Sequence, residues 1–167
     1  MARSRITRRG ASAGCFVSRI LVRPVEPRDA AEWLRMRTAL WPGDHRTEIN
    51  EYFRAGSSLL AVVLVAERSA NALAGFAEIG LRPYAEGCDS SPVPFIEGWY
   101  VDDDARRQGI GRELIRAAEQ WARDRGYREI ASDVEIDNDV SIAAHAALGY
   151  EEVTRLVCFR RALAEPA

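Results

Sequence analysis

The chain has 167 residues, of which 47% are apolar and 29% are charged, and its formal net charge is −2. This composition suits one globular domain with a substantial core. Every basic residue is an arginine, but acidic residues balance them in number, so we expect no binding to nucleic acid. No stretch is long and apolar enough to span a membrane, and no membrane partner is expected.

The cysteines Cys15, Cys88 and Cys158 are odd in number and have no metal-ligand spacing. A disulfide framework and a zinc site are therefore not expected, and we predict a protein without a metal ion. A reducing, cytoplasmic setting is the simplest explanation of free thiols.

Residues 1–18 contain four arginines and a small-residue patch that ends in Ala-Gly-Cys15. A twin-arginine signal with a lipid-attachment-like cysteine would look similar. The segment lacks the apolar run of a signal peptide, however. We therefore expect a disordered extension at 1–18 and one domain at 19–167.

The chain from residue 20 to residue 101 alternates between predicted strands and helices. Apolar runs predict strands, and helical spacing bounded by proline and glycine predicts helices. The predicted strands are 20–22, 59–66, 73–81 and 95–101, and the predicted helices are 27–40 and 46–55. The loop at 82–94 is longer than a hairpin needs, and long ordered loops are more often functional than neutral.

The strand at 95–101 carries a carboxylate in otherwise apolar surroundings. Strict alternation would place Phe95, Glu97, Trp99 and Val101 on one side of the sheet. Burial of Glu97 is unfavourable unless a cation or a hydrogen-bond donor meets it. A site that binds a cation is one explanation.

The last third of the chain continues the α/β pattern. Apolar residues at helical spacing predict a helix at 113–123. A strand at 128–134 follows and contains another carboxylate, Asp133. Strands at 151–153 and 155–160 would then complete the sheet.

Two glycines precede the helix at 113–123. Gly109 and Gly111 leave the backbone bare where a ligand could approach it closely. The first turn of the helix has free N–H groups and the positive end of the helix dipole, which together favour an anion. Arg106, Arg107 and Arg112 add positive charge, although a glycine-rich loop with solvated arginines would look the same.

The spacing separates the ligands that such a turn could hold. A Walker loop requires a lysine, and the chain has none. The dinucleotide fingerprint fails because Leu114 stands where its third glycine should be. The remaining pattern, Arg106-x-x-Gly109-x-Gly111, resembles the pyrophosphate-binding motif of the GNAT superfamily of N-acetyltransferases, which use acetyl-CoA.

A second motif supports this resemblance. In the superfamily an Asn begins the next helix, a Tyr follows seven residues later, and Gly-Phe ends it. Asn138, Gly149 and Tyr150 fit this pattern, whereas His145 stands where the Tyr is usual. The resemblance implies an α/β fold with one GNAT-like domain, in which a mixed, mostly antiparallel sheet with a splayed central strand pair is flanked by helices.

The resemblance also implies which residues bind the cosubstrate acetyl-CoA. They lie on the central strand, the glycine turn and the start of the next helix: Trp99, Tyr100, Val101, Arg106, Arg107, Gln108, Gly109, Ile110, Gly111, Arg112 and Asn138.

A closer resemblance, to aminoglycoside 6′-N-acetyltransferases, runs from about residue 21 to about residue 161. It is carried by residues 40–43, 87–92, 95–98, 131–133 and 145–152. The resemblance implies a substrate site, and a polycationic sugar requires carboxylates and aromatic rings there. The residues are Trp41, Tyr84, Glu97, Asp133 and Glu152. The catalytic candidates are Glu97, Asp133 and His145. Thr154 departs from these relatives, which have an acidic residue there.

Two other functions remain open. The chain could acetylate another amine, such as a polyamine or a protein N-terminus, or it could be a non-catalytic CoA-binding module. The module is disfavoured because Glu97 and Asp133 would then be unexplained carboxylates at strand positions. We further expect a homodimer.

Overall fold

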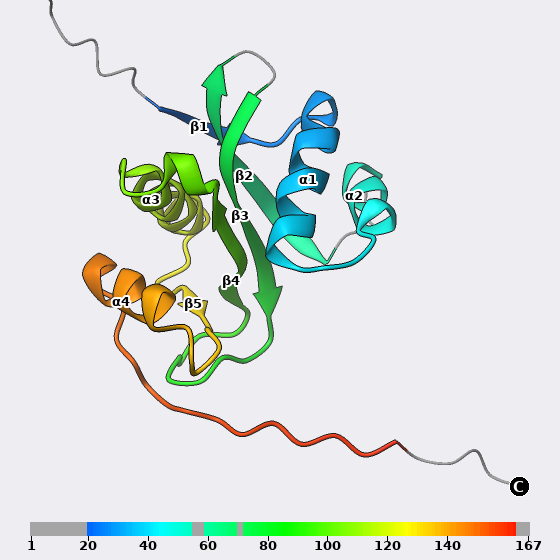
Figure 1. Cartoon of the computed structure of the whole chain (residues 1–167). Coiled ribbons are helices and arrows are strands. Elements are labelled where there is room, and N and C mark those ends of the chain that lie inside the picture. Colours follow the sequence, from blue (N-terminus) through cyan, green and yellow to red (C-terminus); the bar gives the residue numbers. More distant parts are fainter. Residues whose placement is uncertain (1–19, 55–58, 70–71, 163–167) are drawn as a thin grey trace, which may run out of the picture.

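The structure is a computed structural model that describes residues 20–54, 59–69 and 72–162 (Figure 1). The extension predicted at residues 1–18 lies outside these ranges. The strands are β1 (Leu21–Pro24), β2 (Leu60–Ser69), β3 (Ala72–Arg82), β4 (Val93–Val101) and β5 (Ala131–Ser132). The helices are α1 (Ala30–Leu40), α2 (Arg46–Phe53), α3 (Ile110–Asp124) and α4 (Asp139–Leu148), with 3-10 turns at η1 (Pro27–Asp29) and η2 (Asp103–Ala105).

The strands form one sheet in the order β1-β2-β3-β4-β5. The first four are antiparallel neighbours, and β5 is parallel to β4. Helices α1 and α2 cover one face, and α3 and α4 lie on the other (Figure 1). The predicted α/β fold with a mixed, mostly antiparallel sheet is therefore confirmed.

Strands β4 and β5 separate soon after they meet. Only Phe95 and Ile96 of β4 pair with β5, opposite Ala131 and Ser132. Strand β4 continues to Val101 without a described strand on that side. This is the predicted splay, and we call the unpaired stretch between the two strands beyond residue 96 the gap.

Each face of the sheet has its own core. Because the apolar residues of α3 recur at helical spacing, Leu114 and Ala118 pack against Ile79 on one face of the sheet. On the opposite face, α1 buries Trp33 and Met36. Full burial of such a side chain stabilises the fold by about 1.5–3 kcal/mol. The two cores hold the gap between β4 and β5 in a fixed frame.

A β-bulge interrupts the central strand. Glu78 pairs with Gly98, but the next residue, Ile79, pairs with Ile96, so Glu97 has no residue opposite it. A bulge places two successive residues against one and shifts the alternation of side chains. The alternation predicted for 95–101 is therefore wrong beyond Glu97.

The bulge puts Glu97 and Trp99 on opposite faces. The Trp33 indole of α1 donates to Glu78 at 2.8 Å, so Glu78 and, two residues on, Gly80 face α1. The Glu97 side chain lies over Gly80 on this face. Trp99 instead packs into the core beneath α3.

The predicted C-terminal strands do not form. Residues 149–162 contain no helix or strand, and the segment runs away from the sheet beyond α4 (Figure 1). From residue 151 onward its side chains are exposed, with Val157 at 77% and Phe159 at 93%. The strands predicted at 151–153 and 155–160 are wrong, because this segment pairs with no strand in the described part of the chain. The strand predicted at 128–134 is present but shorter, since only Ala131–Ser132 pair with β4.

Among the described residues, no helix is long and apolar enough to cross a membrane. The same part of the chain holds no group of three or more His, Cys, Asp or Glu side chains that could bind a metal ion.

Candidate active site

Gly109 starts helix α3 in a conformation that favours glycine. Its φ is +85°, and a Cβ built on it would meet no atom within 4 Å. The first backbone bond of the helix runs from the N–H of Glu113 to the carbonyl of Gly109. The N–H groups before Glu113 therefore have no acceptor within the helix and can bind an anion above the open glycine.

Gly111 is a glycine for a different reason. A Cβ on this residue would lie 2.8 Å from Cζ2 of Trp99. The second glycine of the motif is therefore required by the packing of helix α3 on the indole of β4. The sequence suggested a ligand for both glycines, and the structure gives the open space to Gly109 alone.

Arg106 and Gln108 shape the turn through backbone contacts. The Arg106 Nε donates to the carbonyl of Val101 at 3.1 Å, and its guanidinium pairs with Asp103 at 2.9 Å. The Gln108 amide donates to the carbonyl of Asp104 at 2.9 Å. These two predicted cosubstrate residues thus fix the loop that precedes the helix.

The other predicted cosubstrate residues differ in what they can offer. Arg107, which has φ +61°, and Arg112 are exposed and can supply charge. Ile110 is buried in the core, and Tyr100 stacks on Phe76. Ile110 and Tyr100 can therefore contribute backbone groups, whereas their side chains hold the fold.

Glu97 meets a cation that the sequence analysis missed. The Arg82 Nε lies 3.0 Å from Glu97 Oε1, and its Nη2 lies 2.6 Å from Oε2. The guanidinium carbon is also 3.4 Å from the centre of the Phe95 ring. The predicted need of Glu97 for a cation is confirmed, because Arg82 supplies it.

Asp133 lies next to the same arginine. It directly follows β5, and its Oδ2 is 3.7 Å from the Arg82 Nη1. The Asp133 side chain is 75% exposed, compared with 28% for Glu97. The structure therefore brings the two predicted carboxylates around one guanidinium, and this pairing weakens our argument that Glu97 would be unexplained in a non-catalytic protein.

The Trp41 ring packs against Gly98, the residue that follows Glu97. Trp41 directly follows α1, and its ring fills the space that a side chain on Gly98 would need. The Arg37 guanidinium lies 5.4 Å from the centre of this ring. Tyr84, on the loop after β3, is 65% exposed, so Trp41 is the more firmly held of the two predicted aromatic residues.

His145 lies across the gap between β4 and β5. Its Nδ1 is 2.8 Å from the carbonyl of Ser141, which can only accept, so Nδ1 carries the hydrogen. Its Nε2 then accepts from the Ser132 hydroxyl at 3.0 Å. The ring meets Trp99 edge to face at 5.3 Å. Ser132 is a second residue that sequence analysis missed, since a Ser at a strand end has no distinguishing pattern.

The side chains of Asn138 and Glu152 each bond to a residue three positions further along the chain. The Asn138 side chain caps α4 by accepting from the N–H of Ser141 at 3.1 Å, which stabilises the helix start. The Glu152 carboxylate, on the C-terminal segment, accepts from Arg155 at 2.6 Å. Asn138 therefore holds His145 in place through its helix, and Glu152 has a local partner.

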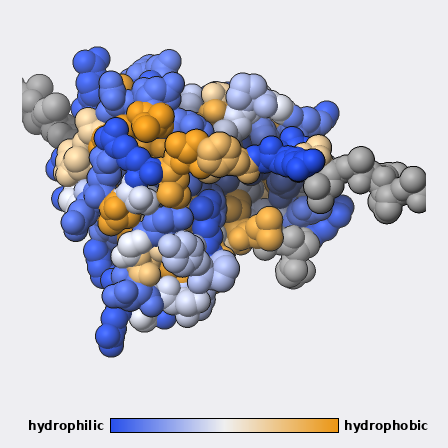
Figure 2. Space-filling view, turned by 90° about the horizontal axis from the view of Figure 1, so that it is seen from below, coloured by the Kyte–Doolittle hydropathy of each residue, from blue (hydrophilic) through white to orange (hydrophobic). Residues whose placement is uncertain are grey.

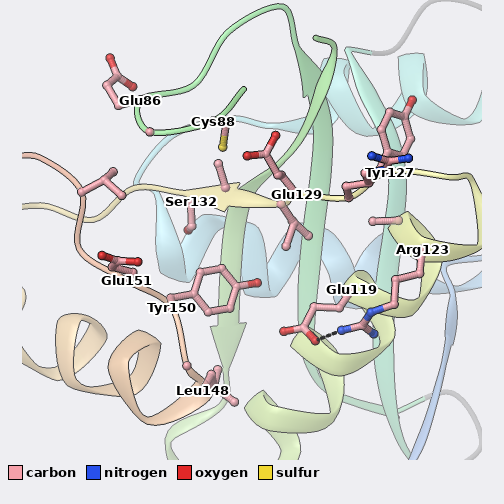
Figure 3. Close-up of a pocket in the computed structure, with 17 residues that line it drawn as sticks. Glu86, Cys88, Glu119, Arg123, Tyr127, Glu129, Ser132, Leu148, Tyr150 and Glu151 are labelled. Carbon is pink, nitrogen blue, oxygen red and sulfur yellow. Dashed lines mark hydrogen bonds and ion pairs between the residues drawn. The ribbon is translucent and has the colours of Figure 1, made fainter. Parts of the chain in front are cut away.

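A pocket of about 660 Å³ lies beside β5 (Figure 3). Ser132, Tyr150 and Cys88 line it, together with residues from the end of α3. The Tyr150 hydroxyl points toward Glu119 and Arg123 (Figure 3) and has no hydrogen-bond partner among the described residues. Desolvation raises the pKa of this hydroxyl above its usual value. The pocket borders the edge of β5 that faces away from β4.

Apolar side chains also gather on the surface in the view from below (Figure 2). Four exposed apolar residues come from the C-terminal segment: Val153, Leu156, Val157 and Phe159.

The sequence profile of the Acetyltransferase (GNAT) family matches residues 28–150. An aminoglycoside N(6′)-acetyltransferase type 1 of Klebsiella aerogenes is 49% identical, over 86% of this chain and 97% of the relative. A protein of the same name from Stenotrophomonas maltophilia is 41% identical, over 87% of this chain and 95% of the relative.

Solved structures agree with the sequence comparison. Aminoglycoside acetyltransferase AAC(6′)-Iy, in complex with the bisubstrate analogue CoA-S-monomethyl-acetylneamine, superimposes with a TM-score of 0.79 at 33% identity, over 87% of this chain and 100% of that one. The enzyme AAC(6′)-Ih from Acinetobacter baumannii superimposes with a TM-score of 0.77 at 31% identity, over 87% and 99%. The chain therefore belongs to the GNAT family of acetyltransferases.

Proposed function

We propose that this protein transfers the acetyl group of acetyl-CoA to the 6′-amino group of aminoglycosides. The observation that carries the proposal is the convergence of Glu97 and Asp133 where β4 and β5 separate. Two carboxylates at this point suit a polycationic amine. The names and coverage of the relatives support the same substrate class.

Acetyl-CoA fits the turn at Gly109. The pyrophosphate would bind the first N–H groups of α3, and the exposed Arg107 and Arg112 would add charge. The gap beside β4 gives the acetyl group a place near the backbone of residues 99–101. A thioester is already reactive, so the protein mainly positions the amine against it and needs no metal ion.

The reaction then requires proton transfers at both the nitrogen and the sulfur. The substrate ammonium must lose a proton before its nitrogen can attack the thioester carbonyl carbon. A C–N bond forms, the C–S bond breaks, and the electron pair of the C–S bond leaves with the sulfur. The nitrogen, which is positively charged after the attack, gives up its second proton, and the departing thiolate takes up a proton.

Acidic and aromatic residues would bind the aminoglycoside. Glu97 and Asp133 would accept hydrogen bonds from its ammonium groups, and Trp41 would cover a sugar ring beside Gly98. Tyr84 and Glu152 would add contacts nearer the solvent. Glu97 is our candidate for the base, directly or through water, because β4 borders the gap.

His145 is the candidate acid for the thiolate. Its ring lies at the gap, beside Trp99 and Ser132. As an acid His145 would act in its imidazolium form, giving the Nε2 proton to the thiolate, and the neutral ring that remains would accept from the Ser132 hydroxyl as it does in the structure. In this arrangement His145 serves where the superfamily usually has a tyrosine.

Release of free thiol from acetyl-CoA tests the proposal directly. We expect rapid release with kanamycin and little with spermidine or a peptide. A preference for spermidine or the peptide would favour another amine as the substrate. Binding of CoA without thiol release in any reaction would favour the non-catalytic module.

We also propose a cytoplasmic homodimer. The C-terminal segment is extended and exposes apolar side chains, and β5 has a strand on one side only within the described chain. A free strand edge and an unpaired extended segment are complementary. The segment of one copy would add to β5 of the other and cover the pocket beside it.

A further inference from the structure

Arg82, the last residue of β3, is held from three sides. Its guanidinium stacks on Phe95 at 3.4 Å and contacts both oxygens of Glu97. A third nitrogen lies 3.7 Å from Asp133. A planar guanidinium with two parallel contacts to a carboxylate fixes orientation as well as distance.

The Glu97 side chain also packs against Gly80 of the neighbouring strand β3. A Cβ on Gly80 would lie 2.6 Å from Glu97 Oε1, so the carboxylate occupies space that only glycine leaves free. Gly80 and Arg82 thus determine where both oxygens of Glu97 lie. Each oxygen accepts one hydrogen from Arg82 and keeps a lone pair for a further donor.

Arg82 contacts a residue of β4 and the residue that follows β5, two strands that share few backbone hydrogen bonds. Only two residue pairs join β4 to β5, and Glu97 and Asp133 belong to opposite sides of the separation. The stability gained from this ion pair is small, because Arg82 is 39% exposed. Its effect on the geometry of the two carboxylates is larger.

We propose that Arg82 is a positioning residue that holds Glu97 and Asp133 as one receptor for a substrate ammonium group. The inference rests on the proposed function, which supplies the polycationic substrate. Arg82 acts through Glu97 and does not itself bind the ammonium, because like charges repel.

Positioning by Arg82 and a simple electrostatic effect of its charge predict opposite changes in substrate affinity. Removal of a positive charge from an acidic cluster would by itself strengthen the binding of a polycation. If Arg82→Gln weakens binding, the loss must therefore come from the lost orientation of the carboxylates. The sign of the change distinguishes positioning from competition.

A double-mutant cycle tests the route through Glu97. Kanamycin affinity would be measured by calorimetry with CoA present for wild type, Arg82→Gln, Glu97→Gln and the double variant, together with kcat and KM. We expect Arg82→Gln to raise the Kd about tenfold, the value of one misplaced charged hydrogen bond. In the Glu97→Gln background the same change should alter the Kd less than about twofold.

Two further variants complete the design. Arg82→Lys keeps the charge but lacks the two parallel, coplanar contacts of a guanidinium. We therefore expect a smaller loss that also disappears in the Glu97→Gln background. This variant carries the test if Arg82→Gln fails to fold. Arg116→Gln is the matched control, because Arg116 makes an exposed ion pair with Glu113 on α3 and no other in the described part of the chain. Its kinetics should equal those of wild type.

Three results would decide against the inference. Unchanged or tighter kanamycin binding in Arg82→Gln would make Arg82 a bystander or a competitor. Additive losses in the double variant would mean that Arg82 acts independently of Glu97. Wild-type protein that acetylates spermidine but not kanamycin would overturn the proposed function and with it this inference, whereas active wild type with an additive cycle overturns the inference alone.

Discussion

Trp99 of β4 lies directly beneath Gly111 of the glycine turn, where a Cβ would come within 2.8 Å of its indole ring. The N-terminus of α3 can approach the central strand this closely because residue 111 has no side chain. The same contact holds the N–H groups of the turn beside the gap between β4 and β5. Gly111 thus allows the close packing of α3 on β4, whereas Gly109 provides the open backbone surface for a ligand.

Gly111→Ala should therefore destabilise the fold as well as weaken acetyl-CoA binding. A forced extra methyl group typically lowers the free energy of unfolding by about 1–3 kcal/mol. Thermal unfolding and calorimetric titration would measure both effects. Trp99→Phe, which shortens the ring, should recover part of the stability lost in Gly111→Ala. It should recover none of the loss in Gly109→Ala, whose Cβ meets no atom.

The pH dependence of stability should reveal a buried ion pair at the first strand. Arg23 donates to both oxygens of Asp29, at 2.7 and 3.0 Å, and these bonds hold the pKa of the Asp29 carboxyl below its usual 3.8. A lowered native pKa adds stability above the unfolded pKa, and this stability is lost as the pH falls through the native value.

Asp29→Asn should thus lower the free energy of unfolding by about 1.5–3 kcal/mol near neutral pH. The difference from wild type should shrink below roughly pH 4, the ordinary range of an aspartate. Urea unfolding at several pH values measures it. Asp44→Asn is the control: Arg46 lowers the pKa of Asp44 to about 2, but the pair is exposed and should contribute little. A difference for Asp29→Asn that does not shrink as the pH falls below 4 would contradict the linkage.

Local patterns predicted the frame of the site well. The helical spacing that includes Leu114 and Ala118 depends on neighbours along the chain, and so does the cap at Asn138. Such features follow from backbone geometry within a few residues. For this reason the turn and α3 could be predicted from the sequence, whereas the start of α4 was implied by the resemblance to the GNAT superfamily.

Contacts between distant residues could not be predicted in this way. The bulge at Glu97 depends on the register of β3 against β4, which a single strand does not reveal. The sequence indicated that Glu97 needs a cation, but any of its many arginines could serve. The position of Arg82 at the end of the neighbouring strand β3 was the signal that could have been used.

Removal of the C-terminal segment should change the oligomeric state. Without residues 153–167, one copy cannot add a strand to β5 of the other, so the truncated protein should elute as a monomer in size-exclusion chromatography with light scattering. Phe159→Asp, at a side chain that is 93% exposed, should weaken the dimer without unfolding the domain. A full-length protein that is monomeric at all concentrations would refute the exchange of segments.

The two carboxylates should differ in their effect on turnover. Glu97→Gln and Asp133→Asn should each weaken aminoglycoside binding about ten- to a hundredfold, the value of a charged hydrogen bond of roughly 1.5–3 kcal/mol. Glu97→Gln should also lower kcat with saturating drug, because Glu97 borders the gap and is the candidate base. Steady-state kinetics across pH, with circular dichroism to check folding, measures both. Wild-type constants in both folded variants would remove the acidic site from the reaction.

His145 gives the last prediction, because its hydrogen bonds fix which nitrogen can take part in a proton transfer. Nδ1 donates to the carbonyl of Ser141, so only Nε2 is available, and Ser132 occupies it. His145→Gln should lower kcat about a hundredfold, in the usual range for general acid catalysis. The KM for the drug should change little, since His145 lies across the sheet from Glu97.

Ser132→Ala should lower kcat less, since water can replace its hydroxyl beside Nε2. Ser141→Ala is the matched control: its hydroxyl is 3.5 Å from Nδ1, and the backbone carbonyl that accepts from Nδ1 remains. Pre-steady-state release of thiol, followed at several pH values, separates the chemical step from product release. If His145→Gln releases thiol at the wild-type rate, another group protonates the leaving thiolate. Tyr150, whose ring centre lies 5.4 Å from that of His145, then becomes the next residue to replace.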